Sequence, residues 1–196
     1  MSKKKGYKIT KRLFDIFMSS LILIVTFPII LIVCICIRVE SKGNPFYKQE
    51  RVGLNGKKIN IYKLRSMYLD AEAGGPKWAD KDDDRITCVG KIIRKTRIDE
   101  LPQLINVLNG DMSLIGPRPE REVFINEFLK ENENFNDRLQ VLPGLSGYAQ
   151  VNGGYDITHH EKFELDMYYI NNMSLLLDIK IIFKTILVVF TGSGAR

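Results

Sequence analysis

Two adjacent acids, Asp99 and Glu100, lie among basic residues in the stretch TRIDELPQLINVLNGDMSLIGPRPE, which runs from Thr96 to Glu120. Arg94 precedes the pair, and Arg118 follows it in a Gly-Pro-Arg-Pro turn, whose prolines restrict the direction of one guanidinium. Guanidinium forks match phosphate oxygens in a bidentate way, and a helix N-terminus adds backbone donors. This set indicates a phosphoryl-transfer centre, provided that a divalent cation neutralises the remaining charge.

The same two acids also fit a purely structural interpretation. Pro102 follows them and is tolerated in a first helical turn, which places both acids at the start of a helix. Acids at that position commonly complement the exposed N–H groups and the helix dipole. The neighbouring arginines favour the catalytic interpretation, because capping alone does not require them.

Other polar clusters in the chain predict less chemistry. The acidic run at 82–84 has no further ligands at metal-binding spacing, so a solvated loop is expected. His159 and His160 are adjacent and lack the H-E-x-x-H spacing, which predicts a surface location for both. These groups leave the Asp-Glu pair as the candidate centre.

The segments around the pair are expected to position it. Residues Asn44 to Met67 predict a β-hairpin around a Leu-Asn-Gly turn, and Tyr68 to Arg85 predicts a polar connection. Thr87 to Lys95 is expected to be a short helix that places Arg94 ahead of the acids. Apolar residues between Leu101 and Leu108 recur at helical spacing, with Gly110 as the expected stop.

The second half of the chain predicts further helices. Glu120 to Leu139 is expected to form one charged amphipathic helix, and Leu142 to Gly154 a glycine-rich loop with a short strand. Two more helices are expected at Glu161 to Tyr169 and Leu175 to Phe190. The last one is apolar but carries two lysines, so it is suited to lie flat on a membrane surface.

An uncharged run from Ile16 to Ile37 has the length of a helix that spans a bilayer core. Pro28 lies inside this run and predicts a kink. Basic residues flank both ends: Lys3, Lys4, Lys5, Lys8, Lys11 and Arg12 on one side, and Arg38, Lys42, Lys48 and Arg51 on the other. Because basic flanks favour the cytoplasmic side, a straight crossing conflicts with this pattern, whereas a re-entrant helix bent at Pro28 does not. A kinked span remains the alternative.

Composition restricts the class of protein. The chain has 196 residues and a formal net charge of +6, which suits an anionic partner such as nucleic acid, phospholipid or a nucleotide. Its three cysteines, Cys34, Cys36 and Cys88, show no metal-binding spacing and indicate a reducing compartment. No nucleic acid partner is expected, because basic residues are not interleaved with aromatic stacking platforms and the apolar run would serve no purpose.

With these residues in view, the chain resembles the monotopic phosphoglycosyl transferases, the bacterial sugar transferase family that begins glycan assembly on polyprenol phosphate. The resemblance covers nearly the whole chain. It rests on KRLFDIF, IYKLRSM, the long block DDDRITCVGKIIRKTRIDELPQLINVLNGDMSLIGPRPE, LPGLSGYAQVNG and KFELDMYYINNMSLLLDIKII.

The resemblance implies a two-step reaction that starts polysaccharide or glycoprotein glycan assembly. Asp99 would attack the β-phosphate of a UDP-sugar, release UMP and pass the sugar phosphate to polyprenol (undecaprenyl) phosphate. Asp99 would also hold Mg2+, while Glu100 would assist deprotonation of the lipid phosphate or position the metal. The resemblance assigns phosphate contacts to Arg94 and Arg118, and weaker positions in the site wall to Lys63, Arg65 and Gln150.

The expected fold is α+β and mainly helical. Residues 1–40 would form the basic N-terminus and a re-entrant membrane helix, and residues 41–196 a compact catalytic domain with interfacial amphipathic helices. The resemblance places this protein as a monotopic enzyme on the cytoplasmic face of the bacterial inner membrane, in contact with membrane lipid. The pattern specifies neither the sugar, the pathway nor the oligomeric state.

Two departures from the family pattern bear on this expectation. Phe27 precedes Pro28 where the family has serine, and Thr26 is expected to supply the missing hydroxyl. Gly154 stands where many members carry arginine, which removes an expected contact to the substrate. The alternative to an enzyme is a membrane-anchored lipid-binding or scaffold protein whose acids only cap helices.

Overall fold

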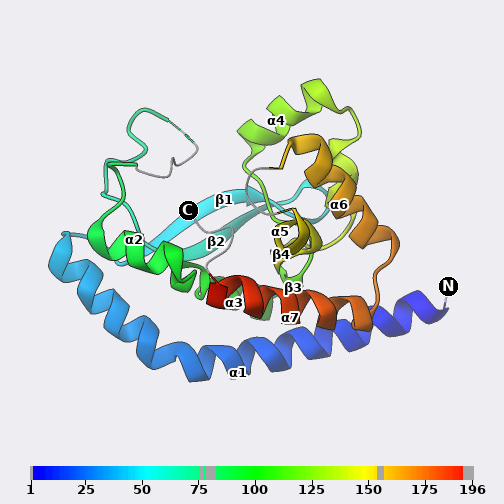
Figure 1. Cartoon of the computed structure of the whole chain (residues 1–196), viewed down its shortest axis with the longest axis horizontal. Coiled ribbons are helices and arrows are strands. Elements are labelled where there is room, and N and C mark those ends of the chain that lie inside the picture. Colours follow the sequence, from blue (N-terminus) through cyan, green and yellow to red (C-terminus); the bar gives the residue numbers. More distant parts are fainter. Residues whose placement is uncertain (1, 76, 78–82, 154–156, 192–196) are drawn as a thin grey trace.

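The computed structural model describes residues 2–75, 77, 83–153 and 157–191, and these form a mainly helical structure with a small amount of sheet (Figure 1). The helices are α1 (Ser2–Glu40), α2 (Cys88–Lys95), α3 (Gln103–Asn109), α4 (Glu122–Glu131), α5 (Tyr148–Asn152), α6 (His159–Asn171) and α7 (Leu175–Thr191). The strands are β1 (Phe46–Val52), β2 (Lys58–Leu64), β3 (Ser113–Ile115) and β4 (Gly144–Ser146). Three short 3-10 helices, η1 (Leu54–Gly56), η2 (Ile98–Glu100) and η3 (Phe135–Gln140), complete the described elements. The expected mainly helical α+β fold is confirmed.

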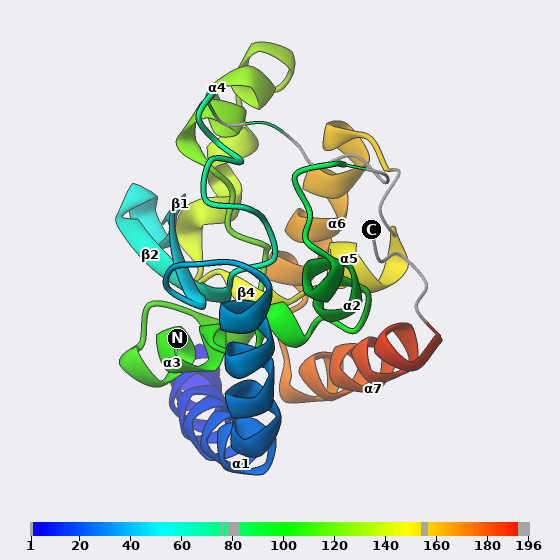
Figure 2. The ribbon, with the colours of Figure 1, turned by 90° about the vertical axis from the view of Figure 1, so that its left-hand side faces the viewer.

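Helix α1 runs along one side of the molecule, and α7 lies beside it (Figures 1 and 2). At 39 residues it is about 58 Å long, roughly twice the thickness of a bilayer core. Its segment Gly6–Glu40 is long and apolar enough to cross a membrane: the most apolar window of 18 residues has a mean hydropathy of 3.1, and only 11% of that window is buried. An exposed apolar surface of this extent is typical of a contact with a membrane or with another protein.

One face of α1 packs against the rest of the protein on both sides of Pro28. Before the proline, Phe14, Met18 and Ile22 contact a buried cluster that contains Leu104 and Val107 of α3. After it, Ile30 and Ile37 are buried in a second cluster with residues of β2 and α2. The opposite face exposes large apolar side chains, among them Leu13, Phe17, Leu21, Ile24, Val25, Phe27, Leu31, Ile32, Ile35 and Val39.

The hydroxyl of Thr26 bonds within α1, but not at the position that Pro28 frees. Pro28 has no N–H, so the carbonyl of Ile24 loses its helical partner. Thr26 Oγ1 instead donates to the carbonyl of Ile22 (2.7 Å). The expected compensation by Thr26 is therefore not the contact that this structure contains.

The predicted hairpin is confirmed. Strands β1 and β2 pair antiparallel from Phe46 opposite Leu64 to Val52 opposite Lys58. The Leu-Asn-Gly segment makes the reversal, with Asn55 and Gly56 both at positive φ.

A buried side chain joins the hairpin to α3. The amide of Asn106 accepts a hydrogen bond from the Tyr62 N–H (3.0 Å) and donates to the Asn60 carbonyl (2.8 Å). It thus pairs with the outer edge of β2 as a neighbouring strand would. This contact fixes β2, and with it the nearby Lys63, relative to the helix that follows the Asp-Glu pair.

The helices on either side of the acids occur where the sequence predicts them. Thr87 caps α2 by accepting a hydrogen bond from the Gly90 N–H (2.9 Å). Helix α3 ends at Gly110, whose φ of 87° is the left-handed conformation that glycine adopts without strain. Between the two helices, Arg97 is also left-handed (φ 56°) and turns the chain into η2.

The second half of the chain corrects two predictions. The expected single helix from Glu120 to Leu139 is divided into α4 and η3, because Asn132 adopts an extended conformation (φ −144°, ψ 102°). The expected loop contains the predicted short strand, β4, but also helix α5. Strand β4 pairs parallel with β3, a contact between distant segments that no local pattern indicates.

Three basic residues counted as membrane flanks instead contact protein groups. Lys11 pairs with Asp178 of α7 (3.1 Å), and Arg12 donates to carbonyls at the end of α3. Arg51 lies in β1 and bonds to the Pro119 carbonyl (3.3 Å). The flanking charge available to lipid headgroups is therefore smaller than the sequence suggests.

Candidate active site

Asp99 and Glu100 lie in η2, between the C-terminus of α2 and the start of α3. Asp99 is 8% exposed, and Glu100 is also largely shielded from solvent. The left-handed conformation of Arg97 sets this placement, because it ends the course of α2 and starts the 3-10 helix that carries the two acids. Backbone strain of this kind is typical of positions where the surrounding structure holds a functional side chain.

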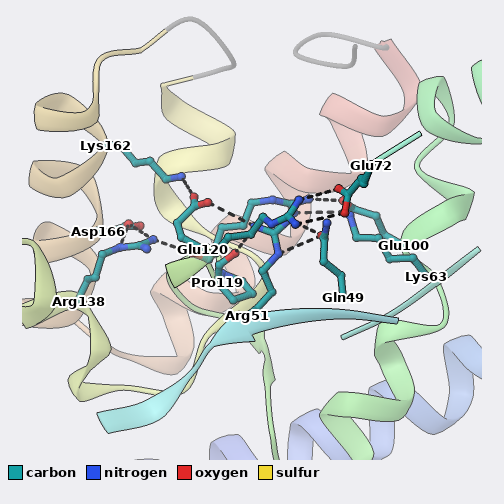
Figure 3. A network of polar contacts seen from close by, with 12 residues as sticks. Gln49, Arg51, Lys63, Glu72, Glu100, Pro119, Glu120, Arg138, Lys162 and Asp166 are labelled. Carbon is teal, nitrogen blue, oxygen red and sulfur yellow. Dashed lines mark hydrogen bonds and ion pairs between the residues drawn. The ribbon is translucent and has the colours of Figure 1, made fainter. Parts of the chain in front are cut away.

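Glu100 is held by two cations from distant parts of the chain. Both terminal nitrogens of Arg118 donate to its carboxylate, one at 3.3 Å, in a bidentate arrangement. Lys63 Nζ lies 3.4 Å from the same carboxylate (Figure 3). Burial alone would raise the pKa of Glu100, but the charges of Arg118 and Lys63 hold it far below its usual range. Glu100 is therefore a permanent anion and a weak base.

Asp99 is buried like its neighbour but differs from it in its partners and in the direction of its pKa shift. Within the described part of the chain its carboxylate makes no hydrogen bond or ion pair. Burial and the adjacent Glu100 charge raise its pKa to about 6. The nearby cations Lys63, Arg94 and Arg118 oppose this rise without cancelling it.

This contrast between the two adjacent carboxylates indicates that they have different chemical roles. A carboxylate with a raised pKa is more basic, and so more nucleophilic, than an ordinary aspartate. Because it has no protein partner, it is also available to an incoming electrophile. Asp99 has the properties of the reacting group, and Glu100 those of a fixed charge that organises the cations.

A second buried acid lies behind the Arg118 turn. Glu120 is 2% exposed and pairs with Lys162 of α6 and with Arg51 of β1 (3.5 Å), as Figure 3 shows. Burial acts to raise its pKa, but Lys162, Arg138 and Arg51 lower it to about 2. The group thus ties the hairpin and α6 to the segment that carries Arg118.

Arg138 supports the same turn from the opposite side. Its guanidinium pairs with Asp166 (2.7 Å), and both side chains are 1% exposed. The same nitrogen donates to the backbone carbonyl of Arg118 (2.7 Å). The turn is further held by a hydrogen bond from the Gly144 N–H to the Pro117 carbonyl (2.9 Å). The direction of the Arg118 side chain is therefore set by contacts from η3, α6 and β4.

The structure brings five of the predicted site residues together and leaves two apart. Asp99, Glu100, Lys63, Arg94 and Arg118 share one electrostatic cluster. The two others make no hydrogen bond or ion pair to it among the described residues.

Arg65 and Gln150 have other contacts. The Arg65 guanidinium donates to the carbonyls of Ser41 (2.8 Å) and Lys42 (2.7 Å), so it holds the chain that leaves α1. Gln150 lies in α5 and bonds weakly to the Leu145 carbonyl (3.4 Å). The guanidinium of Arg65 is thus committed to backbone groups, and the site-wall roles of Arg65 and Gln150 stay predictions.

Sequence reasoning missed the supporting residues of the site. Glu120 directly follows the Gly-Pro-Arg-Pro turn and could have been found from that position, because an acid next to a rigid turn that carries an arginine is close to other charged groups. Arg51, Arg138, Lys162 and Asp166 carried no local signal, since their partners are distant in the chain.

The weaker candidates remain outside the cluster. Asp83 pairs with Arg85 (2.6 Å), whereas Asp82 and Gly154 lie outside the described residues. His160 is exposed as expected. His159 is half-buried, because its ring packs on Phe128 with centroids 3.8 Å apart, so the surface prediction is wrong for it.

A magnesium ion fits this site only in combination with substrate. Residues 2–75, 77, 83–153 and 157–191 contain no group of three or more His, Cys, Asp or Glu side chains that could hold a metal. Asp99 nevertheless offers an unpaired carboxylate, and Mg2+ is commonly held by one or two carboxylates together with substrate phosphates and water. The single carboxylate of Asp99 therefore suits an ion whose other ligands are the phosphate oxygens of a nucleoside diphosphate and water.

Comparison with known proteins identifies relatives along the whole chain. A model of the bacterial sugar transferase family matches residues 6–192. The UDP-N-acetylgalactosamine-undecaprenyl-phosphate N-acetylgalactosaminephosphotransferase of Aeromonas hydrophila is 46% identical over 193 residues. The UDP-glucose:undecaprenyl-phosphate glucose-1-phosphate transferase of Klebsiella pneumoniae and the sugar transferase EpsL of Bacillus subtilis are each 40% identical, over 190 and 188 residues.

These relatives differ in length from the chain. The aligned segments cover 97%, 94% and 96% of this chain for the Aeromonas, Klebsiella and Bacillus proteins. The same segments cover 46% and 41% of the first two proteins and 91% of the third. The chain thus spans less than half of two relatives and nearly all of the other.

Replacing Glu120 with glutamine tests the second ion network. The pKa of Glu120 in the fold, about 2, lies below its ordinary value of 4.5. Ionised Glu120 therefore stabilises the fold above about pH 4.5, and this contribution, at most about 3 kcal/mol, is lost as the pH falls toward 2. We expect melting temperatures in detergent micelles to decline less between pH 6 and pH 3 for Glu120→Gln than for wild type.

Glu127→Gln, an exposed position on α4, is the matched control and should keep the wild-type pH dependence. Equal slopes for Glu120→Gln and wild type would show that the buried acid is not held ionised by its partners.

Proposed function

The chain belongs to the bacterial sugar transferase family, and we propose that it transfers a sugar phosphate from a UDP-sugar to polyprenol phosphate through a covalent intermediate on Asp99. The observation that carries this proposal is the contrast between Asp99, buried and unpaired, and Glu100, held by two cations. The relatives named for transfer to undecaprenyl phosphate support the choice of acceptor.

The first half-reaction forms a bond between a carboxylate oxygen of Asp99 and the β-phosphorus of the donor. The bond between this phosphorus and the bridging oxygen breaks, and UMP leaves with the electron pair. Arg94 and Lys63 lie close enough to Asp99 for their charges to lower its pKa. They are therefore placed to bind the oxygens of a phosphate that Asp99 attacks. The raised pKa of Asp99 favours the attack, because nucleophilicity rises with basicity.

In the second half-reaction a phosphate oxygen of the lipid attacks the phosphorus of the acyl phosphate. The bond to Asp99 breaks and its carboxylate is regenerated, while the product carries sugar and lipid on a diphosphate. An acyl phosphate is reactive enough for this step. Asp99 forms the bond to phosphorus in the first displacement and loses it in the second. Its carboxylate must therefore be free of protein partners, and its burial keeps water away from the acyl phosphate.

Glu100 fits the role of a positioning residue better than that of a base. Its depressed pKa, caused by Arg118 and Lys63, makes it a poor acceptor for a proton from the lipid phosphate. Its charge instead holds both cations beside Asp99 and keeps the pKa of Asp99 high. The low pKa of Glu100 disfavours the first role expected from the family resemblance, deprotonation of the lipid phosphate, and we assign Glu100 the organisation of charge around Asp99 in its place.

A divalent cation is the proposed cofactor, with Asp99 as its protein ligand. When bound, Mg2+ would neutralise negative charge on the donor diphosphate and on the departing UMP. Arg118 and Lys63 cannot supply all of this charge, since both are engaged with Glu100. The protein groups therefore leave room for one further positive charge at the phosphates.

We propose that α1 enters and leaves the membrane on the same side. Asp15, before Pro28, accepts a hydrogen bond from Ser113 (2.7 Å), and Glu40, at the other end, accepts one from the Cys88 N–H (2.6 Å). Both ends therefore contact one folded body, which a straight span of about 58 Å could not do from opposite faces of a bilayer. The exposed apolar face of α1 would then lie in the hydrocarbon of the bacterial membrane, and the helix would enter from the cytoplasmic side.

Helix α7 extends the proposed membrane surface. It lies beside α1 in both ribbon views (Figures 1 and 2), and Leu176, Phe183 and Leu187 on it are more than 60% exposed. An amphipathic helix in this position would rest at the headgroup boundary. The two helices together would bring the site to the depth of a lipid phosphate, while the UDP-sugar arrives from water.

The proposed activity is tested by nucleotide release. Purified protein with Mg2+, UDP-sugars and undecaprenyl phosphate should release UMP, and Asp99→Asn should lower the rate by at least about 10³-fold, because the amide cannot form the covalent bond. Release of UMP by Asp99→Asn at the wild-type rate would contradict the mechanism. No release from any UDP-sugar, with unchanged binding to liposomes, would favour the membrane-anchored scaffold instead.

The topology of α1 is tested by labelling. Single cysteines in place of Lys8 and Lys42, both exposed, are introduced into a variant without the three native cysteines. A membrane-impermeant maleimide should label both positions in inside-out vesicles and neither in intact spheroplasts. Labelling of the two positions from opposite sides would establish a spanning helix and contradict the re-entrant arrangement.

A further inference from the structure

We propose that Arg12 and Glu40, near opposite ends of α1, are positioning residues that hold the two helices on either side of the Asp-Glu pair. This inference rests on the proposed function of that pair. It assigns to the membrane helix a part in the donor half-reaction, which uses a water-soluble nucleotide and needs no lipid.

Arg12 holds the end of α3. Its two terminal nitrogens donate to the carbonyls of Val107 (2.5 Å) and Leu108 (2.8 Å), which lie in the last turn of the helix. The Val107 carbonyl also accepts a hydrogen bond from the Gly110 N–H that caps the helix (3.1 Å), so Arg12 adds a second donor there, and a cation at a helix C-terminus is favoured by the dipole. A β-carbon placed on Gly110, the residue that ends α3, would lie 3.5 Å from the guanidinium. The guanidinium of Arg12 therefore lies at ordinary contact distance from this terminus.

Glu40 holds the start of α2. Its carboxylate accepts hydrogen bonds from the N–H groups of Cys88 (2.6 Å) and Val89 (3.0 Å), the first two residues of that helix. Thr87 satisfies a third N–H, that of Gly90, so the N-terminus of α2 is capped by two residues from different elements. An anion at this end complements the helix dipole, as the cation does at the end of α3.

The segment between these two contacts contains the reacting group. From Cys88 to Asn109 the chain forms α2, η2 and α3, with Asp99 near its middle. Ile98 and Leu101, on either side of the acids, pack against the buried cluster that contains Ile30 and Ile37 of α1. One helix thus holds both ends of the catalytic segment and also contacts its centre.

The geometry at Asp99 consequently depends on the shape of α1. The two contacts lie 28 residues apart on a helix that contains Pro28 between them, so a change of bend at the proline changes their separation. Asp99 has no hydrogen bond or ion pair of its own in the described structure, and its position is therefore set by the backbone that α1 holds. Small displacements of a reacting group lower rates without abolishing binding.

The test measures the donor half-reaction alone. Exchange of radiolabelled UMP into UDP-sugar is followed in liposomes without polyprenol phosphate for Arg12→Gln and Glu40→Gln. Lys8→Gln and Glu127→Gln, both exposed, are matched controls for the loss of each charge. We expect kcat to fall about tenfold in the two variants with KM changed less than twofold, and Arg12→Lys to recover part of the loss. Exchange within twofold of wild type in both would overturn the proposal.

Hydrogen exchange separates this inference from the proposed activity. In Arg12→Gln and Glu40→Gln, amides of 98–108 should exchange faster than in wild type, while those of the hairpin 46–64 should not. This readout needs no turnover, so it decides the proposal even if no UDP-sugar is a substrate. Unchanged exchange at 98–108 would refute it, as would equal acceleration in the hairpin, which indicates general destabilisation.

Discussion

The ion pairing of Glu100 with Arg118 and Lys63 is the interaction on which the site depends. Two carboxylates placed side by side in a buried position cannot both be ordinary, because each disfavours the charge of the other. Pairing one of them with two cations makes it permanently anionic, and the other, Asp99, is left more basic and without a partner. The division of roles between adjacent and chemically similar side chains thus follows from where their neighbours lie.

The cations of the site are in turn fixed by contacts that extend through most of the fold. Arg138 holds the backbone carbonyl of Arg118, and Asn106 holds the strand that carries Lys63. These supports come from η3 and α3, which are far apart in the chain. Helix α1 completes the scaffold, so a segment that looks like a simple anchor also belongs to the structure of the active site.

Local patterns predicted the hairpin, α2, α3 and their boundaries well, because turns, caps and apolar spacing are properties of neighbouring residues. The Asp-Glu pair and both flanking arginines were found for the same reason. What could not be predicted depends on distant partners: the parallel pairing of β3 with β4, the burial of Glu120 between Arg51 and Lys162, and the contacts of Lys11 and Arg12 with helices rather than lipid. The contacts of Arg65 with the Ser41 and Lys42 carbonyls also could not be predicted, because those partners lie more than twenty residues away in the chain.

The central claim is that the carboxylate of Asp99 carries the sugar phosphate between donor and acceptor. Intact-protein and peptide mass spectrometry, after rapid quenching of enzyme with Mg2+ and UDP-sugar but no lipid acceptor, tests this directly. We expect an added sugar phosphate on the peptide that contains Asp99, together with a stoichiometric burst of UMP. An adduct on a different side chain, or a full burst with unmodified protein, would contradict it.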